Sequence, residues 1–260
     1  MPFTLSHPAA ILPIRRTYLP LSALVVGSLA PDFEYLIHLQ PKSLFSHSLP
    51  GVFLFCVPSG FLVLWLFHSI WKKPLIILLP DPHQTRLLNY VQDFPFKPFT
   101  RFLMICASLI IGSLTHIAWD AFTHSYGWAV KNFPVFTTPL LQIHGYRIRV
   151  YKILQHGSSA AGMLLILIIY LNWFKKEARL HLLSPSALRP LARWLVIFVI
   201  ASSSALMGML CAFLKIQSGH DPFSFKTALG FAIPSFFLVL IIELTLYGLY
   251  QKSREKLKRV

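Results

Sequence analysis

Long apolar stretches alternate with short polar and basic segments along most of this chain. Five stretches are apolar over the roughly 20 residues that a helix needs to cross a bilayer. They lie near residues 49–71, 102–119, 158–174, 194–214 and 229–250. The pattern predicts an all-α fold, a multi-pass transmembrane helical bundle of about five spans. Pro58 and Pro234 lie within or near the start of two spans, and we expect them to kink those helices.

An earlier apolar run, residues 19–39, is interrupted by the Pro31-Asp32 pair. We interpret this run as two short N-terminal helices in or near the membrane interface, with a broken sixth span as the alternative. No internal repeat or low-complexity segment divides the chain. We therefore expect one membrane-embedded helical domain over residues 1–250, followed by a basic tail over residues 251–260.

The composition agrees with a membrane protein. Hydrophobic residues make up 55% of the chain and charged residues 13%, against about 25% charged residues in soluble proteins, and the mean hydropathy is +0.60. The formal net charge is +15, which in a soluble protein would favour nucleic-acid binding. Here the basic residues lie mostly in loops and the tail, so topology and contact with membrane lipids explain them, and no nucleic-acid partner is expected.

The distribution of Lys and Arg predicts the orientation. With five spans, alternate segments carry 15 basic residues on one side and 9 on the other. The positive-inside rule then places the 15 in the cytoplasm. The N-terminal region and residues 120–157 and 215–228 are expected to face outward.

The segment His116-Ile-Ala-Trp-Asp120-Ala-Phe-Thr-His124 ends the second apolar stretch. Residues at i, i+4 and i+8 share one face of a helix, so His116, Asp120 and His124 are expected to lie together. Imidazole nitrogen and carboxylate oxygen are zinc ligands, and ionisable groups at the mouth of a membrane helix indicate function. A polar helix end that hydrogen-bonds its neighbours is the alternative interpretation.

More candidate ligands belong to the same predicted face of the membrane. They are His7, Asp32, His47, His144, His156 and His220. For Asp32 a helix cap is as good an interpretation as a metal ligand. His47 and His124 are flanked by hydroxyl residues, which either cap helices or orient a ligand histidine through its second ring nitrogen.

Three further charged residues are candidates for a functional role. Glu243 lies deep in the last span, where a hydrogen bond to another helix is favoured over a proton relay. Arg147 and Arg149 lie in the outward segment and are candidates for binding a substrate phosphate, although a solvated loop at the lipid surface is the favoured interpretation.

The ordered set His7, Asp32, His47, His116-x3-Asp120, His124, His156 resembles the zinc-dependent phospholipase C and single-strand nuclease superfamily, and also membrane-bound metal-dependent hydrolases of bacteria. A closer resemblance, carried by MPFTLSHPAA, GSLAPDFEY, FSHS, GSLTHxxWDxFTH and LQHGSS, is to an uncharacterised bacterial integral-membrane family of unknown function. The superfamily's final Hxxx(E/D) pair is incomplete, because Ala160 stands four positions after His156. The resemblance therefore implies one or two zinc ions rather than three.

These observations lead to one expectation and two alternatives. The expectation is a zinc-dependent hydrolase of a phosphoester, in a lipid or lipid-linked substrate, in the bacterial inner membrane with its site at the extracytoplasmic face. The first alternative is a non-catalytic membrane protein with a structural metal or a hydrogen-bonded His/Asp cluster. The second is a transporter, which would need polar groups through the membrane midplane, where Glu243 stands alone.

Overall fold

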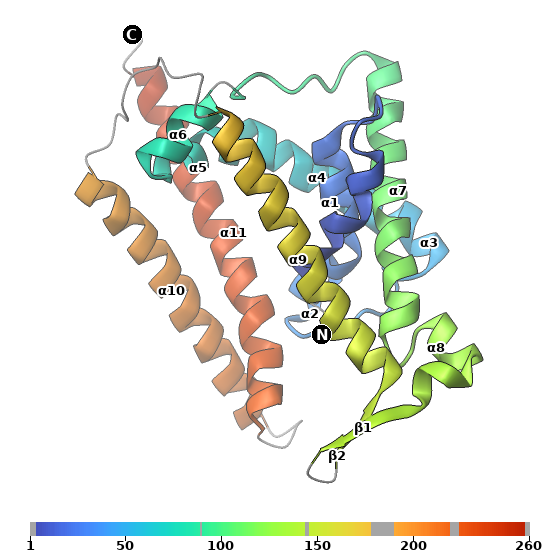
Figure 1. Ribbon diagram of the computed structural model, residues 1–260. Helices are drawn as coiled ribbons and strands as arrows, with labels where there is room; N and C mark the ends of the chain where they lie inside the picture. Colours follow the sequence, from blue (N-terminus) through green and yellow to red (C-terminus); the bar gives the residue numbers. More distant parts are fainter. Residues whose placement is uncertain (1–3, 89, 144–145, 178–189, 219–223, 258–260) are drawn as a thin grey trace. The chain divides into compact units, whose positions relative to one another are not determined.

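The fold is helical, as predicted (Figure 1). The computed structural model describes residues 4–88, 90–143, 146–177, 190–218 and 224–257. The N-terminal half comprises η1 (Thr4–Ile14), α1 (Leu21–Leu29), η2 (Ala30–Phe33), α2 (Glu34–His38), α3 (Leu49–Gly51), η3 (Val52–Cys56), α4 (Val57–Leu66), η4 (Phe67–Trp71), α5 (Lys72–Leu78) and α6 (Asp81–Leu88). The remainder comprises α7 (Phe99–Thr123), α8 (Trp128–Asn132), η5 (Pro134–Thr137), β1 (Pro139–Ile143), β2 (Tyr146–Arg149), α9 (Val150–Glu177), α10 (Pro190–Gln217) and α11 (Phe225–Leu257).

Five segments are long and apolar enough to cross a membrane, which confirms the predicted number of spans. They are Leu49–Leu78, Phe99–Asn132, Val150–Lys176, Pro190–Gln217 and Phe225–Glu255. Each is longer than predicted because the helices continue past the apolar stretch into polar residues. A π-helical turn, η3, lies directly before Pro58 in the first span, where the proline ring cannot accommodate an α-helical carbonyl.

The 19–39 run consists of two short helices, as predicted. α1 passes through the 3-10 turn η2, which contains Pro31 and Asp32, into α2. An antiparallel hairpin, β1–β2, was not predicted. It pairs Leu141 with Ile148 and Gln142 with Arg147, in a segment that is too short to show a periodic pattern.

The described chain forms two compact units, each made of separate stretches of sequence. Unit 1 comprises Met1–Phe33, Ser43–Phe61 and Phe96–Asn172, and unit 2 comprises Glu34–Lys42, Leu62–Pro95 and Trp173–Val260. The expectation of one membrane domain over residues 1–250 is not tested by this division and stays a prediction.

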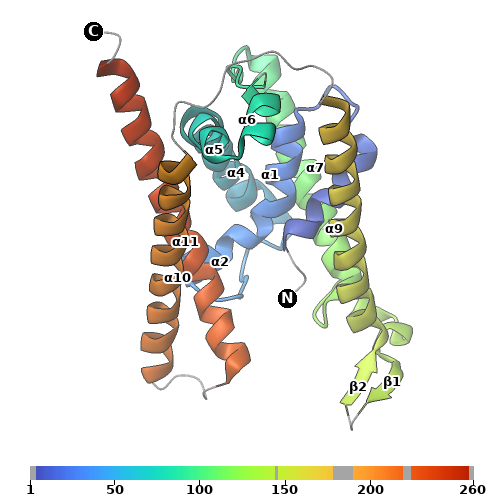
Figure 2. The same ribbon diagram turned by 60° about the vertical axis from the view of Figure 1, so that its left-hand side comes forward.

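Unit 2 is built around α10 and α11, which lie side by side (Figure 2). Ser204 on α10 donates a hydrogen bond of 2.9 Å to Oε2 of Glu243 on α11. This is the interhelical bond favoured for Glu243 from the sequence, and it satisfies a carboxylate that would be costly in an apolar environment. The indole N–H of Trp71, in η4, donates a second hydrogen bond to α11, to Thr245 Oγ1 at 2.9 Å.

Unit 1 is organised by a close contact between α1 and α7. A Cβ atom added to Gly112 would lie 2.4 Å from the carbonyl oxygen of Leu24 and 2.6 Å from the amide nitrogen of Ser28. A Cβ atom added to Gly27 would likewise lie 2.5 Å from the carbonyl oxygen of Leu109. Small residues allow helix backbones to approach closely. This close packing places the C-terminal end of α7 beside η2, which follows α1.

This contact predicts different outcomes for two Gly→Ala substitutions. In Gly112→Ala the added methyl group meets backbone atoms, which cannot turn aside, so the free energy of unfolding should fall by about 1–3 kcal/mol. Gly157→Ala is the matched control, because nothing lies within 4 Å of its added Cβ and alanine favours a helix. Thermal unfolding of the detergent-solubilised protein, followed by tryptophan fluorescence, compares them. Equal melting temperatures for the two variants would contradict the assigned contact.

Candidate metal centre

The carboxylate of Asp120 lies among four imidazole rings of unit 1. Its Oδ1 is 3.2 Å from His7 Nε2 and 3.2 Å from His124 Nδ1. Its Oδ2 is 3.4 Å from His47 Nε2 and 3.4 Å from His116 Nε2. Each oxygen of one carboxylate thus faces two histidine nitrogens.

Helix α7 accounts for half of this arrangement through local geometry. His116 and Asp120 are one turn apart on the helix, as the sequence spacing predicts. His124 is the C-terminal cap of α7, with an extended backbone at φ −115° and ψ 146°. Its amide nitrogen still donates to the carbonyl oxygen of Asp120 at 3.1 Å, so the ring stays beside the carboxylate after the helix has ended.

Asp32 supplies a second carboxylate from η2. Its Oδ1 lies 3.6 Å from Nε2 of His47 and 3.6 Å from Nε2 of His116. Its Oδ2 accepts a hydrogen bond of 2.5 Å from the hydroxyl of Thr4. The contact of Thr4 with Asp32 was not predicted from the sequence, although Thr4 lies three residues before His7 on the same 3-10 helix. Asp32 therefore joins the cluster, while the helix-cap interpretation finds no hydrogen bond in its support.

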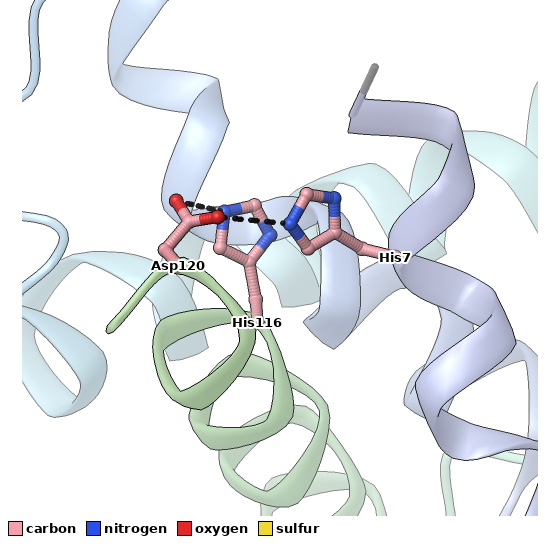
Figure 3. A group of neighbouring side chains, drawn as sticks. All are labelled: His7, His116 and Asp120. Carbon is pink, nitrogen blue, oxygen red and sulfur yellow. Dashed lines mark hydrogen bonds and ion pairs between the residues drawn. The ribbon is translucent and has the colours of Figure 1, made fainter. Parts of the chain in front are cut away.

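Two of the histidines carry a proton on the nitrogen that points away from the carboxylates. His116 Nδ1 donates to the carbonyl oxygen of Ser28 at 2.8 Å, and His7 Nδ1 donates to that of Thr4 at 3.1 Å, since a carbonyl can only accept. In the neutral rings the Nε2 lone pairs then face Asp120 (Figure 3). Lone pairs directed at a carboxylate require a cation between them, either a proton or a metal ion. A backbone carbonyl behind the ring is the usual support of a metal-binding histidine.

The distances also fit a metal site. A tetrahedron of ligands about 2.1 Å from a central ion has edges of about 3.4 Å. The four nitrogen-to-oxygen distances that join His47 and His116 to Asp32 and Asp120 are 3.4–3.6 Å. His116 Nε2 and Asp32 Oδ1 are buried atoms that have no hydrogen-bond partner within the described parts of the chain. The group of Asp32, His47 and His116 could hold a metal ion, and so could the group of His7, His116 and Asp120.

The centre is almost closed to solvent. His7 and His116 are fully buried, and Asp120 is 4% exposed. The rings of His7 and His116 stack at 3.8 Å between centroids, with 13° between their planes. The His47 side chain, at 13%, is the most exposed of the six. Water therefore does little to separate these charged and polar groups, and they must satisfy one another or bind an ion.

The hydroxyls beside two candidate ligands contact ring nitrogens, but only at His47 is this the second ring nitrogen expected from the sequence, because His124 Nδ1 also faces Asp120. Ser46 Oγ lies 3.1 Å from His47 Nδ1, and Thr123 Oγ1 lies 3.3 Å from His124 Nδ1. Ser48 has the capping role instead, since it accepts from the amide nitrogen of Gly51 at 3.1 Å.

The structure brings together six of the predicted site residues: His7, Asp32, His47, His116, Asp120 and His124. His156 is exposed on α9, and within the described parts of the chain no ion pair or hydrogen bond joins it to the six. Arg147 and Arg149 are exposed on β2. His144 and His220 lie outside the described residues.

Removing the central carboxylate should destabilise unit 1. In metal-free protein, Asp120→Ala leaves four imidazoles, three of them buried, without the carboxylate that they share, which should lower the free energy of unfolding by about 3–5 kcal/mol. Titration with a denaturing detergent measures this loss. Asp93→Ala, which removes an exposed carboxylate, is the control and should leave the unfolding transition unchanged. A transition in Asp120→Ala that matches the control would show that the cluster contributes nothing to the fold.

Comparison with known proteins bears on the family alone. No curated protein and no solved structure matches the chain, and nothing in the comparisons supports the resemblance to the zinc-dependent phospholipase C and nuclease superfamily, which stays a prediction. The uncharacterised family inferred from the sequence is borne out. The family model described as a domain of unknown function (DUF4184) matches residues 1–249, and the chain belongs to that family.

Proposed function

We propose that this membrane protein binds one or two divalent metal ions, of which zinc fits best, at the Asp120 centre and uses them to hydrolyse a phosphoester. The observation that carries the proposal is the position of Asp120, whose two oxygens each face two histidine nitrogens at 3.2–3.4 Å. A carboxylate in this position bridges two ligand sets. Its histidine and carboxylate donors suit zinc and related first-row ions.

A metal ion explains more of the geometry than a hydrogen-bond network does. The 3.6 Å separations of Asp32 Oδ1 from His47 and His116 are too long for hydrogen bonds. They match the spacing of two ligands on one ion. With neutral rings and no metal, His116 Nε2 and Asp32 Oδ1 would be buried without a hydrogen-bond partner among the described residues, at a cost of about 1–3 kcal/mol for each atom.

The two ligand sets differ in a way that favours catalysis. Asp120 Oδ2 completes a set of four donors with Asp32, His47 and His116, which is the number found in closed structural zinc sites. Its Oδ1 forms a set of only three with His7 and His124. Catalytic zinc sites have three protein ligands and keep a further position for water or substrate. Zinc bound there would supply hydroxide near neutral pH by acidifying water.

The substrate is proposed to be a lipid or a lipid-linked phosphoester. Asp120 lies within the second apolar span, near the end of α7, where a soluble substrate would have to leave water. Arg147 and Arg149 on the exposed hairpin are proposed to contact the phosphate. The Lys and Arg distribution supports a site at the extracytoplasmic face of a bacterial inner membrane.

A structural metal site is the second candidate, and the burial of the centre favours it. His7 and His116 are fully buried, and η1 is fixed to α7 through His7 and Asp120. A metal in this role would hold the N-terminal helix on unit 1 without any turnover.

The metal content of the purified protein tests the first part of the proposal. Wild type should contain one or two zinc ions per chain by mass spectrometry of metals, and His116→Ala and Asp120→Asn should each lose most of them. His156→Ala is the matched control, because this exposed histidine makes no described contact with the cluster, and it should retain the wild-type content. Wild type that stays free of metal after reconstitution with zinc would overturn the proposal.

Hydrolysis is tested separately on metal-loaded protein. Wild type should release product from phospholipids or from bis(p-nitrophenyl) phosphate, lose this activity on chelation and regain it with zinc. His124→Ala removes one ligand of the three-donor set, so the rate should fall by about 100-fold or more while metal in the four-donor set is retained. Full metal content without turnover of either substrate would favour the structural role.

A further inference from the structure

Unit 2 contains two buried arginines that the proposed metal centre does not use. Arg86 on α6 is 8% exposed, and Arg193 in the first turn of α10 is 4% exposed. Arginine is almost never buried without a partner that balances its charge. These two side chains, 107 positions apart in the sequence, therefore require an explanation.

Both guanidinium groups bind residues 79–82, which follow α5 and include the first two residues of α6. Arg193 Nη1 donates to the carbonyl oxygen of Leu79 and to Oδ1 of Asp81, each at 3.0 Å. Arg86 Nη1 donates to the carbonyl oxygen of Pro82. The two positively charged side chains are therefore both bonded to residues 79–82.

The local negative charge does not balance them. Asp81 is the one acidic residue of the sequence within residues 72–88 and 190–217, and its side chain is 59% exposed. Each guanidinium has five N–H donors, and among the described residues neither the buried Nε of Arg86 nor that of Arg193 has a hydrogen-bond partner. Arg86, Arg193 and Asp81 together thus carry one net positive charge, and at least two donors are unused within the described part of the chain.

Aromatic packing fixes one of the two arginines. The guanidinium carbon of Arg86 lies 3.8 Å from the centre of the Phe174 ring, and the ring of His83 lies 4.6 Å from the same phenyl ring. Stacking on an aromatic face leaves the edge of a guanidinium, where its N–H groups lie, directed sideways. The edge is the part that binds oxyanions.

The position of the pair along the chain indicates what anion is available. Leu78 ends the first membrane span, and Pro190 begins the fourth, so Arg86 lies eight residues past the end of one span and Arg193 three residues after the start of the other. Lipid phosphates lie at this level of a bilayer. The geometry points to a phosphate-binding site formed by Arg86 and Arg193, in which phosphate oxygens accept from the unused N–H groups of the two guanidiniums and balance the excess charge. Guanidinium groups suit this role because their planar donors match phosphate oxygens.

Three additions to delipidated, full-length wild type in a non-ionic detergent test the inference and identify the source of the phosphate. They are dioleoyl phosphatidylglycerol, dioleoylglycerol (the same acyl chains without phosphate), and inorganic phosphate against chloride at equal ionic strength. A rise in melting temperature with phosphatidylglycerol alone would assign the site to a lipid headgroup. A rise with inorganic phosphate as well would assign it to free phosphate. If dioleoylglycerol stabilises as much as phosphatidylglycerol, or if no addition stabilises, the inference is overturned.

Variants then test the two residues. Arg86→Gln and Arg193→Gln should each raise the half-saturating concentration of the effective ligand by about tenfold, which is the loss of one charge-assisted hydrogen bond. Arg254→Gln is the control, because Arg254 is exposed near the end of α11 in the same unit, and it should bind as wild type does. If the Gln variants do not fold, Arg193→Lys keeps the charge, loses the planar donors, and should weaken binding in the same direction. Binding that is equal in all variants would overturn the assignment.

Discussion

The carboxylate of Asp120 is the group on which the arrangement of unit 1 depends. Four histidines from three separate parts of the chain converge on its two oxygens. In a centre this poorly hydrated, the imidazoles cannot be satisfied by water, and each needs either this carboxylate or an ion held beside it. The N-terminal helix η1 and the segment before the first span are positioned by the same requirement, through His7 and His47.

Backbone packing makes this convergence possible. The contact of α1 with α7 at Gly27 and Gly112 brings the carbonyl oxygen of Ser28 within 2.8 Å of His116 Nδ1. That bond fixes which ring nitrogen carries the proton and turns Nε2 towards the carboxylates. The small residues of the interface and the chemistry of the centre are therefore two parts of one arrangement, because a wider interface would release the histidine.

The two units place charge in opposite ways. In unit 1 two carboxylates are surrounded by histidines, a set of donors that suits a cation. In unit 2 Arg193 pairs with the exposed carboxylate of Asp81, while Arg86 is bonded to a backbone carbonyl, a set that suits an anion. Asp120 lies near the end of α7, and Arg193 lies near the start of the fourth apolar span.

The sequence by itself determined the features that depend on local periodicity. Apolar stretches of sufficient length predicted five spans, and the four-residue spacing of His116, Asp120 and His124 placed them together because a helix repeats every 3.6 residues. Only the tertiary structure decided which distant residues join them. His7 lies 113 residues from Asp120, and its inclusion, like the exclusion of exposed His156, depends on how helices pack. The role of Thr4 and the hairpin β1–β2 depend on contacts too few and too short to leave a periodic pattern in the sequence.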